Sequence, residues 1–438
     1  MARLVKGARL LDPANGIDRT GDVLIEKGRI AKIGGDLRPE GDTETIEGKG
    51  MVLSPSFVDL HVHLREPGRE DAETIESGTR AASAGGFGAV ACMPNTDPPM
   101  DNAGTVRFIL ERAAEAGPVK VLPVAAVTSG RKGGRLSEIG ELVRAGAVAV
   151  TDDGDAVENP RLMRRALEYT RMFDIPVMTH AEIPELSRGG VMHEGEMSLR
   201  LGLRGIPSES ETAAIDRDVR LAEMTGGRLH VCHVSTAGGV EIIRRAKEKG
   251  LFVTGETAPH YLALTDQSLA GYDTNRKMNP PIRSAADRDA LRKGLAEGVL
   301  DAIATDHAPH PAHEKDVEFD EAPFGVLGLE TALPVAITYL VRTGHLGLPA
   351  LIERLTSGPA RIIGLDHPGL VEGAEASLTL FDPDASWVVD PYRLQSISRN
   401  TPFAGERLFG VVICVLIGDR RLDGPERGGA GAFPDEEA

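Results

Sequence analysis

The feature that most constrains the fold is an alternation of short apolar runs with longer helical segments through the middle of the chain. Segments with helical periodicity, such as GTVRFILERAAEAG and NPRLMRRALEYTRMF, separate the apolar runs. Alternating strands and helices predict a parallel sheet, and eight such runs predict a closed (β/α)8 barrel of the TIM type. The eight runs are SFVDLHVH, GAVACMPN, VLPVAAVT, AVAVTDDG, PVMTHAE, LHVCHVS, FVTGETAPH and DAIATDHAP.

Both ends of the chain have a different pattern. The first fifty residues, and the later runs ASLTLFDPDASWVV and RLFGVVICVLIGDRRL, read as short strands separated by Gly, Asp and Pro turns. We expect these two sets to pair as a small β-sandwich domain made from residues 1–53 and 367–438, beside a barrel of residues 54–366. The final DGPERGGAGAFPDEEA is predicted to be a loose tail.

Composition excludes several classes of protein. Lys and Arg total 49 and Asp and Glu total 66, a net charge of −17, which disfavours binding to nucleic acid or anionic membrane. No apolar stretch approaches the roughly 20 residues that span a bilayer, and the N-terminus does not resemble a signal peptide. Cys92, Cys232 and Cys414 lie in apolar runs without CxxC spacing, so we expect buried thiols and a cytoplasmic location.

Side chains that can bind a metal or transfer a proton follow the apolar runs. In (β/α)8 barrels the active site lies at the carboxyl ends of the strands. His61 and His63 in DLHVHLR are two residues apart, so they project to one side of a strand. Two imidazoles there can hold a divalent metal. The motif alone is equally compatible with two ordinary polar residues at a strand end.

Three further candidates close other runs. They are His180 in VMTHAE, His233 in VCHVS and Asp306 in IATDHAP. One such histidine is more often a satisfied core or surface residue than a ligand. Four histidines and an aspartate on one predicted rim favour a metal site.

A second metal requires a bridging ligand. Asp152 and Asp153 in AVAVTDDG each offer a carboxylate that can span two cations about 3.5–4 Å apart. The other member of the pair would then be a supporting or turn residue. This run contains no lysine, and the nearest ones, Lys132 and Lys247, lie in polar contexts, so we do not expect a carboxylated lysine bridge.

These residue types predict amide hydrolysis. Two zinc ions lower the pKa of a shared water, so that a hydroxide can attack an amide carbon near neutral pH. Asp306 can bind metal through one oxygen and carry a proton to the departing nitrogen with the other. The reverse reaction would condense a carboxylate with a ureido nitrogen.

The sequence also contains candidate substrate-binding residues. Arg65, with Asn95 in MPN and Asn279 in KMNPP, can form a receptor for a carboxylate. Each asparagine is equally compatible with a role in a turn. Residues 307–325 read as a long loop, either a lid that excludes water or an ordinary solvated loop. Gly325 in this loop would let a ligand approach the backbone closely.

The chain resembles the amidohydrolase superfamily and, within it, the long bacterial (class I) form of the dihydroorotases. HxH is shared across the superfamily, but MPNT, KMNPP and ATDHAPH together are much more specific. The resemblance covers nearly the whole chain and implies the reversible interconversion of N-carbamoyl-L-aspartate and L-dihydroorotate in pyrimidine (UMP) biosynthesis.

The resemblance also assigns roles by position. It implies two Zn²⁺ per subunit, bridged by Asp153 and a hydroxide, with Asp306 as the catalytic acid and base. The implied zinc ligands are His61, His63, Asp153, His180, His233 and Asp306. The implied substrate contacts are Arg65, Asn95, Asn279 and His310, with backbone contacts from Phe324 and Gly325. We expect a homodimer, and some family members associate with aspartate transcarbamoylase.

Two alternatives stay open. One is a hydantoin or allantoin hydrolase. The carboxylate receptor disfavours it, because hydantoins need not carry a carboxylate, and so does the missing lysine, because those enzymes use a carboxylated lysine. The other is a non-catalytic scaffold for aspartate transcarbamoylase, which the presence of all six ligands disfavours.

Overall fold

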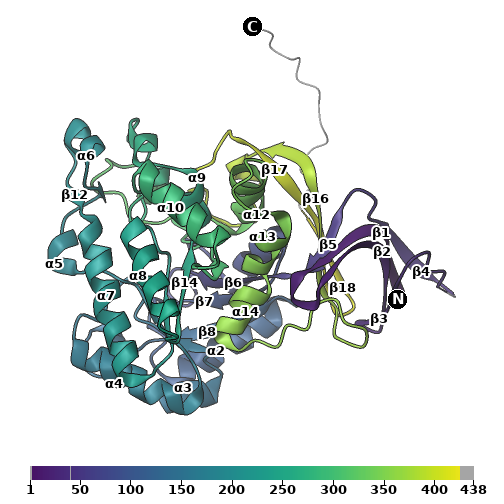
Figure 1. The fold of residues 1–438 in the computed structure, drawn as a ribbon, viewed down its shortest axis with the longest axis horizontal. Coiled ribbons are helices and arrows are strands. Elements are labelled where there is room, and N and C mark those ends of the chain that lie inside the picture. The colour runs from purple at the N-terminus through teal and green to yellow at the C-terminus, as the bar shows by residue number, and fades with distance from the viewer. Residues whose placement is uncertain (1, 40, 425–438) are drawn as a thin grey trace, which may run out of the picture.

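The computed structural model describes residues 2–39 and 41–424, and its central element is a barrel of eight parallel strands (Figure 1). Each strand pairs with the next along the chain, in the order β6-β7-β8-β9-β10-β13-β14-β15. The strands are β6 (Phe57–Val62), β7 (Phe87–Cys92), β8 (Lys120–Ala125), β9 (Ala149–Val150), β10 (Val177–Thr179), β13 (Leu229–Val231), β14 (Val253–Thr257) and β15 (Ala302–Ile303).

The first and last strands meet just beyond β15. Val62 and His307 form an isolated parallel bridge, and the His63 backbone N–H donates to the His307 carbonyl at 2.9 Å. The barrel is therefore nearly closed, and the predicted (β/α)8 fold is confirmed because all eight apolar runs contain a barrel strand.

Helices cover the outside of the barrel (Figure 1). Several begin at the side-chain caps that their sequences provide: Thr74 accepts a hydrogen bond from the Ser77 N–H, and Asn102 accepts from Thr105. The long helices are α1 (Ile75–Ala84), α2 (Ala103–Ala116), α3 (Ile139–Ala145), α4 (Pro160–Thr170), α7 (Ser208–Thr225), α8 (Ala237–Glu248), α10 (Ala285–Ala296), α13 (Leu348–Leu355) and α14 (Ser357–Ile363).

Shorter elements lie in the loops. The short helices are α5 (Pro184–Ser187), α6 (Glu196–Leu201), α9 (Pro259–Ala263), α11 (Ala312–Lys315) and α12 (Ala332–Ala336), the last followed by a π-helical turn over Ile337–Val341. Two short strands, β11 (Met192–His193) and β12 (Gly205–Ile206), form a separate pair.

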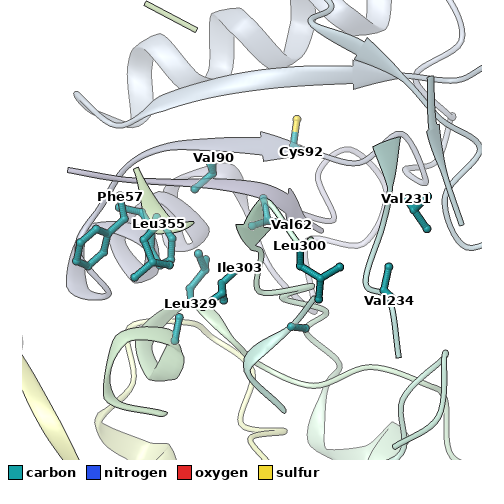
Figure 2. Close-up of a cluster of buried hydrophobic side chains, with 14 of the residues drawn as sticks. Phe57, Val62, Val90, Cys92, Val231, Val234, Leu300, Ile303, Leu329 and Leu355 are labelled. Atoms are coloured by element: carbon teal, nitrogen blue, oxygen red, sulfur yellow. The ribbon is translucent and has the colours of Figure 1, made fainter. Parts of the chain in front are cut away.

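The apolar faces of strands and helices meet in one large core. Val62, Val90 and Ile303 come from barrel strands, and Leu329 and Leu355 from the segments that pack on them (Figure 2). Each side chain is fully buried, and burial of this kind stabilises the fold by about 1.5–3 kcal/mol per residue. This packing fixes the strand ends that carry the polar residues.

Strands from both ends of the chain form the second unit, as predicted, and they belong to one mixed sheet. Its order is β18-β17-β16-β5-β1-β2-β3, with β4 also paired to β1. The strands are β1 (Ala2–Asp12), β2 (Ile17–Glu26), β3 (Arg29–Gly34), β4 (Thr43–Glu47), β5 (Val52–Pro55), β16 (Ser377–Val388), β17 (Arg407–Ile417) and β18 (Arg420–Asp423).

The junction between the two halves of this sheet is the antiparallel pairing of β5 with β16, where Leu53 faces Leu380. Both residues lie in a core that also contains Leu10, Val23 and Cys414. The predicted loose tail lies outside the described residues from residue 425 onward.

All three cysteines are buried and unpaired, as predicted. Within residues 2–39 and 41–424, no helix is both long and apolar enough to cross a bilayer.

Candidate metal centre and active site

The site begins with an irregularity in β6. Asp59 faces Val90 of β7, whereas Val62 faces Cys92, so β6 contains one extra residue between these pairs. The Asp59 Oδ1 atom holds this bulge by accepting the backbone N–H groups of His61 (3.1 Å) and Thr305 (3.0 Å). Bulges redirect side chains, and here both His61 and His63 reach carboxylates on other strands.

Asp153 lies at the centre of four imidazoles. The residue follows β9 and is only 2% exposed. Its Oδ2 atom is 3.5 Å from His63 Nε2. Its Oδ1 atom lies 3.2 Å from His61 Nε2, 3.5 Å from His233 Nε2 and 3.7 Å from His180 Nδ1. One carboxylate is therefore shared by four histidines from three separate strand ends.

Asp306 completes the cluster on one side of Asp153. Its Oδ1 atom is 3.2 Å from His63 Nε2 and 3.6 Å from His61 Nε2. On the other side, His180 Nδ1 and His233 Nε2 lie 3.0 Å apart. The six predicted ligands thus fall into two groups that share the Asp153 carboxylate.

The donor set fits metal ions. Among the described residues, His61 Nε2 and Asp153 Oδ1, which lie 3.2 Å apart, are buried without a hydrogen-bond partner. Unpaired polar atoms in a dry interior cost free energy, and cations between them would remove that cost. His61, His63 and Asp306, and likewise His61, Asp153 and His233, place one ligand atom each within 4.8 Å of the others.

The two aspartates are ionised in this environment. Burial raises the pKa of Asp306, but the His61 and His63 imidazoles outweigh it and bring the pKa to about 2. Burial likewise opposes ionisation of Asp153, whereas His61 and His233 hold the pKa of its carboxyl well below the ordinary value. Both carboxylates therefore offer negative charge to a cation.

Backbone strain concentrates at the site. Arg65, His233 and Asp306 have φ values of 62°, 34° and 48°, which non-glycine residues rarely adopt. Such conformations persist where the surrounding structure enforces them, commonly at functional sites.

The cluster opens into a cavity of about 210 Å³. Five of the six predicted ligands line the cavity, and His61 lies fully buried behind them. The predicted substrate contacts line the same cavity: Arg65, Asn95, Asn279, His310, Phe324 and Gly325.

Arg65 is held by the loop that follows β15. Its Nε–H donates to the Pro309 carbonyl at 3.1 Å, and its Nη2 lies 3.3 Å from His310 Nε2. Burial lowers the pKa of Arg65 to about 10, so the guanidinium stays cationic at neutral pH. Burial and the adjacent Arg65 charge lower the pKa of His310 to about 4. This end of the cavity therefore carries a fixed positive charge.

The two predicted asparagines also touch the histidines. Asn95 Oδ1 is 2.8 Å from His63 Nδ1, so the outer nitrogen of that ring faces an acceptor while Nε2 faces the carboxylates. Asn279 Nδ2 lies 3.3 Å from both His180 Nε2 and Glu182 Oε2. Each amide therefore connects the His/Asp cluster to the cavity.

The predicted loop over residues 307–325 is tied down at several points. Asn400, in the segment between β16 and β17, accepts the His310 N–H at 3.1 Å and donates to the carbonyls of Ala308 (3.0 Å) and Gly325 (3.1 Å). The buried Lys277 ammonium donates to the Phe319 carbonyl at 2.7 Å. Two segments outside the loop thus fix its path over the cavity.

Asp152 does not join the cluster. Its carboxylate accepts the backbone N–H of Thr128 at 2.9 Å and the Thr128 hydroxyl, which anchors a loop. Lys247 pairs with Asp301 at 2.7 Å, next to the amino end of β15, and none of the residues lining the cavity is a lysine.

Sequence reasoning missed four supporting residues: Asp59, His230, Glu256 and Asn400. Asp59 and Glu256 carried a usable signal, since each is an acid inside an apolar run. His230 carried the same kind of signal, as a polar residue inside LHVCHVS, whereas Asn400 gave none, because it lies in a loop and its partners are distant in sequence.

Comparison with known proteins agrees with this geometry. Residues 50–238 match the family described as Dihydro-orotase-like. The chain is 53% identical to a dihydroorotase of Syntrophotalea carbinolica over 96% of this chain and 98% of that protein. It is 52% identical to a dihydroorotase of Anaeromyxobacter dehalogenans over 95% of this chain and 96% of the relative.

Solved structures share the fold. An L-hydantoinase from Arthrobacter aurescens superposes with a TM-score of 0.87 at 26% identity, covering 97% of this chain and 96% of that chain. A dihydropyrimidinase from Brevibacillus agri gives a TM-score of 0.85 at 22% identity, with 98% and 96% covered.

The barrel, the attached mixed sheet and the buried cluster together define a hydrolase with the amidohydrolase-like fold. Within that class, nearly full-length identity of about 50% is decisive. The chain belongs to the dihydroorotase family.

Proposed function

We propose that this chain catalyses the reversible, zinc-dependent cyclisation of N-carbamoyl-L-aspartate to L-dihydroorotate and water, a step of UMP biosynthesis. The observation that carries the proposal is a single cavity lined by both the His/Asp cluster and the Arg65 receptor. The acyclic substrate has two carboxylates, one that reacts and one that must be held, and the two parts of the cavity match these needs.

The metal assignment follows the two groups around Asp153. His61, His63 and Asp306 would hold one Zn²⁺, and His180 with His233 the other, with Asp153 bridging. The support is the position of the Asp153 carboxylate, within 3.7 Å of a nitrogen of all four histidines. When bound, the two cations polarise the reacting carbonyl and stabilise the negative charge that develops on its oxygen.

We assign substrate binding to the far side of the cavity. The Arg65 guanidinium, anchored at Pro309, would take the non-reacting carboxylate in a bidentate contact. Asn95, Asn279 and His310 would supply further polar contacts, and the backbone of Phe324 and Gly325 would hold the pyrimidine ring. All of these residues line the one cavity.

We assign the proton transfer to Asp306. During cyclisation the ureido nitrogen bonds to the carboxyl carbon and gives its proton to Asp306. The carboxyl C–O bond then breaks, and the departing oxygen takes that proton and a second one from solvent and leaves as water. In the hydrolytic direction water adds to the ring amide carbon and gives one proton to Asp306. The C–N bond then breaks, Asp306 passes that proton to the nitrogen, and the new carboxyl group releases the second proton to solvent.

The test is metal content and turnover in one preparation of the holoprotein. We expect about two zinc ions per chain and turnover of both L-dihydroorotate and N-carbamoyl-L-aspartate. Turnover of hydantoin without turnover of L-dihydroorotate would overturn the substrate assignment. A folded protein that binds no zinc at this site would instead support a non-catalytic scaffold.

The remaining assignments concern organisation. We propose a homodimer in the cytoplasm, with aspartate transcarbamoylase as an additional partner, and domain limits of 1–53 plus 367–438 and 54–366. The three unpaired cysteines suit a reducing compartment. Sedimentation of the purified chain, alone and mixed with the transcarbamoylase, tests both associations.

A further inference from the structure

A buried carboxylate lies next to the metal-binding cluster, inside the barrel. Glu256 is in β14 and is fully buried. Its Oε1 atom is 3.5 Å from His61 Nδ1, and its Oε2 atom is 3.1 Å from His230 Nε2 on β13. The His230 Nδ1 atom lies 2.9 Å from the Thr254 hydroxyl. A continuous chain of polar groups therefore runs from Thr254 to the ring of His61.

Apart from the two imidazoles, little in its surroundings would stabilise the buried Glu256 carboxylate. An unpaired charge in the interior is strongly unfavourable, and among the described residues neither Glu256 oxygen accepts an aligned hydrogen bond. Its close neighbours are the two imidazoles, which lie at ion-pair distances.

The orientation of His61 gives Glu256 a role. His61 Nε2 faces Asp153 at 3.2 Å, while Nδ1 faces Glu256. A carboxylate beside Nδ1 favours the tautomer with the proton on that nitrogen, which leaves the Nε2 lone pair free for a cation. Carboxylates placed behind metal-binding histidines in this way commonly raise metal affinity.

We propose that Glu256 is a positioning residue for the metal centre, which holds the His61 ring with Nε2 directed at the cation and adds a negative charge behind it. His230 is the counterpart that keeps the carboxylate in place. The inference rests on the proposed function, because it requires that His61 bind a metal.

The alternative is a separate ion bound by His61, Cys232 and Glu256, whose ligand atoms lie within 4.8 Å of one another. In that arrangement the ring of His61 would be turned to a cation on its Nδ1 side, and Cys232 would supply a thiolate. The positioning role instead uses the Nε2 side of His61, which already faces Asp153 at 3.2 Å.

The experiment compares zinc affinity with the stability of the metal-free protein. Wild type, Glu256→Gln and Asp12→Asn are stripped with a chelator and titrated with Zn²⁺ against a chromophoric competitor. Asp12 is a matched control, since its carboxylate is also buried and accepts the Leu370 N–H at 2.8 Å, but in the mixed sheet. Thermal unfolding of each metal-free protein is measured in parallel.

We expect Glu256→Gln to weaken zinc binding by about 10–100-fold and to leave the unfolding temperature of the metal-free protein close to wild type. Asp12→Asn should lower the unfolding temperature and leave zinc affinity unchanged. A purely structural Glu256 would give the Asp12 result, and loss of one whole equivalent of zinc with the rest unaffected would support the separate ion. Either result overturns the proposal.

A second variant tests the proposal if Glu256→Gln cannot be measured. If Glu256→Gln does not fold, His230→Gln should still weaken zinc binding by about 3–10-fold, a smaller loss because His230 acts through Glu256. Wild-type affinity in His230→Gln would then refute the chain of contacts. Failure of the wild-type protein to bind zinc would refute the metal centre itself, which is a different outcome.

Discussion

The side-chain amide of Asn400 makes three hydrogen bonds between the C-terminal segment and the mouth of the barrel. It is 2% exposed. Its oxygen accepts the His310 N–H, and its nitrogen donates to the carbonyls of Ala308 and Gly325. We expect Asn400→Ala to displace His310 and Gly325, both of which line the cavity.

The size of the effect follows from these three contacts. A buried hydrogen bond contributes about 1 kcal/mol net, so their loss should lower the free energy of unfolding by roughly 3 kcal/mol. If about half of that free energy holds the cavity wall in place, kcat/KM falls about tenfold, since 1.4 kcal/mol corresponds to a factor of ten. Asn400→Asp should be more harmful, because it turns an oxygen toward the Ala308 and Gly325 carbonyls.

The assay combines urea unfolding, zinc content and steady-state turnover of L-dihydroorotate. Asn102→Ala is the control: it removes the cap of α2, which should cost about 1 kcal/mol of stability without changing kcat/KM. A variant of Asn400 that loses stability but keeps kcat/KM within about twofold of wild type would refute its role in shaping the cavity.

Four further outcomes test other parts of the site. Asp306→Ala should abolish turnover in both directions, and a near-normal rate would reject its role as proton carrier. Arg65→Ala should raise KM by roughly 30–150-fold, the value of a charge-assisted contact of about 2–3 kcal/mol, with zinc content unchanged. Parallel loss of zinc would make Arg65 structural. Gly325→Ala should impair substrate binding, because the Gly325 φ is +136° and an added Cβ would meet Ala308 at 2.9 Å. The control is Gly250→Ala: Gly250 also has a positive φ (+74°) but lies in open space, so this variant should affect stability alone. Burial lowers the pKa of Lys315 from 10.5 to about 7. Between these pH values the unfolded chain binds one more proton than the folded chain, so the stability of the folded protein rises with pH. The unfolding free energy of wild type relative to Lys315→Met should therefore increase by up to about 4 kcal/mol from pH 7 to pH 10.5, and a constant difference would contradict the shift.

The barrel was predictable because its strands are buried on both faces and therefore read as nearly continuous apolar runs. The same property marked the candidate site, since a polar residue at the end of such a run is conspicuous. His180, His233 and Asp306 all have this signature, and the structure brings them to one cluster. Local pattern was sufficient wherever the relevant contact follows from strand position.

Other features depend on contacts that local pattern does not contain. The bulge at Asp59 is fixed by the backbone of Thr305, 246 residues away. Asn400 reaches His310 across 90 residues. Glu256 reads as an anomaly inside a strand until His61 and His230 are placed beside it. In each case a single polar side chain satisfies distant groups, and only the folded topology identifies its partners.

The segment between β16 and β17 links the mixed sheet to the His/Asp cluster. Between β16 and β17 the chain crosses the barrel mouth, where the Ser396 hydroxyl donates to the buried Glu73 carboxylate. Glu73 lies 3.4 Å from His307 Nε2, and the His307 carbonyl accepts the His63 N–H at the seam that closes the barrel. Because His307 adjoins Asp306, this chain of contacts runs from the mixed sheet to both a histidine and an aspartate of the metal-binding cluster. Pairing the two ends of the chain in one sheet therefore fixes the segment that completes the site, so the mixed sheet helps to position the His/Asp cluster.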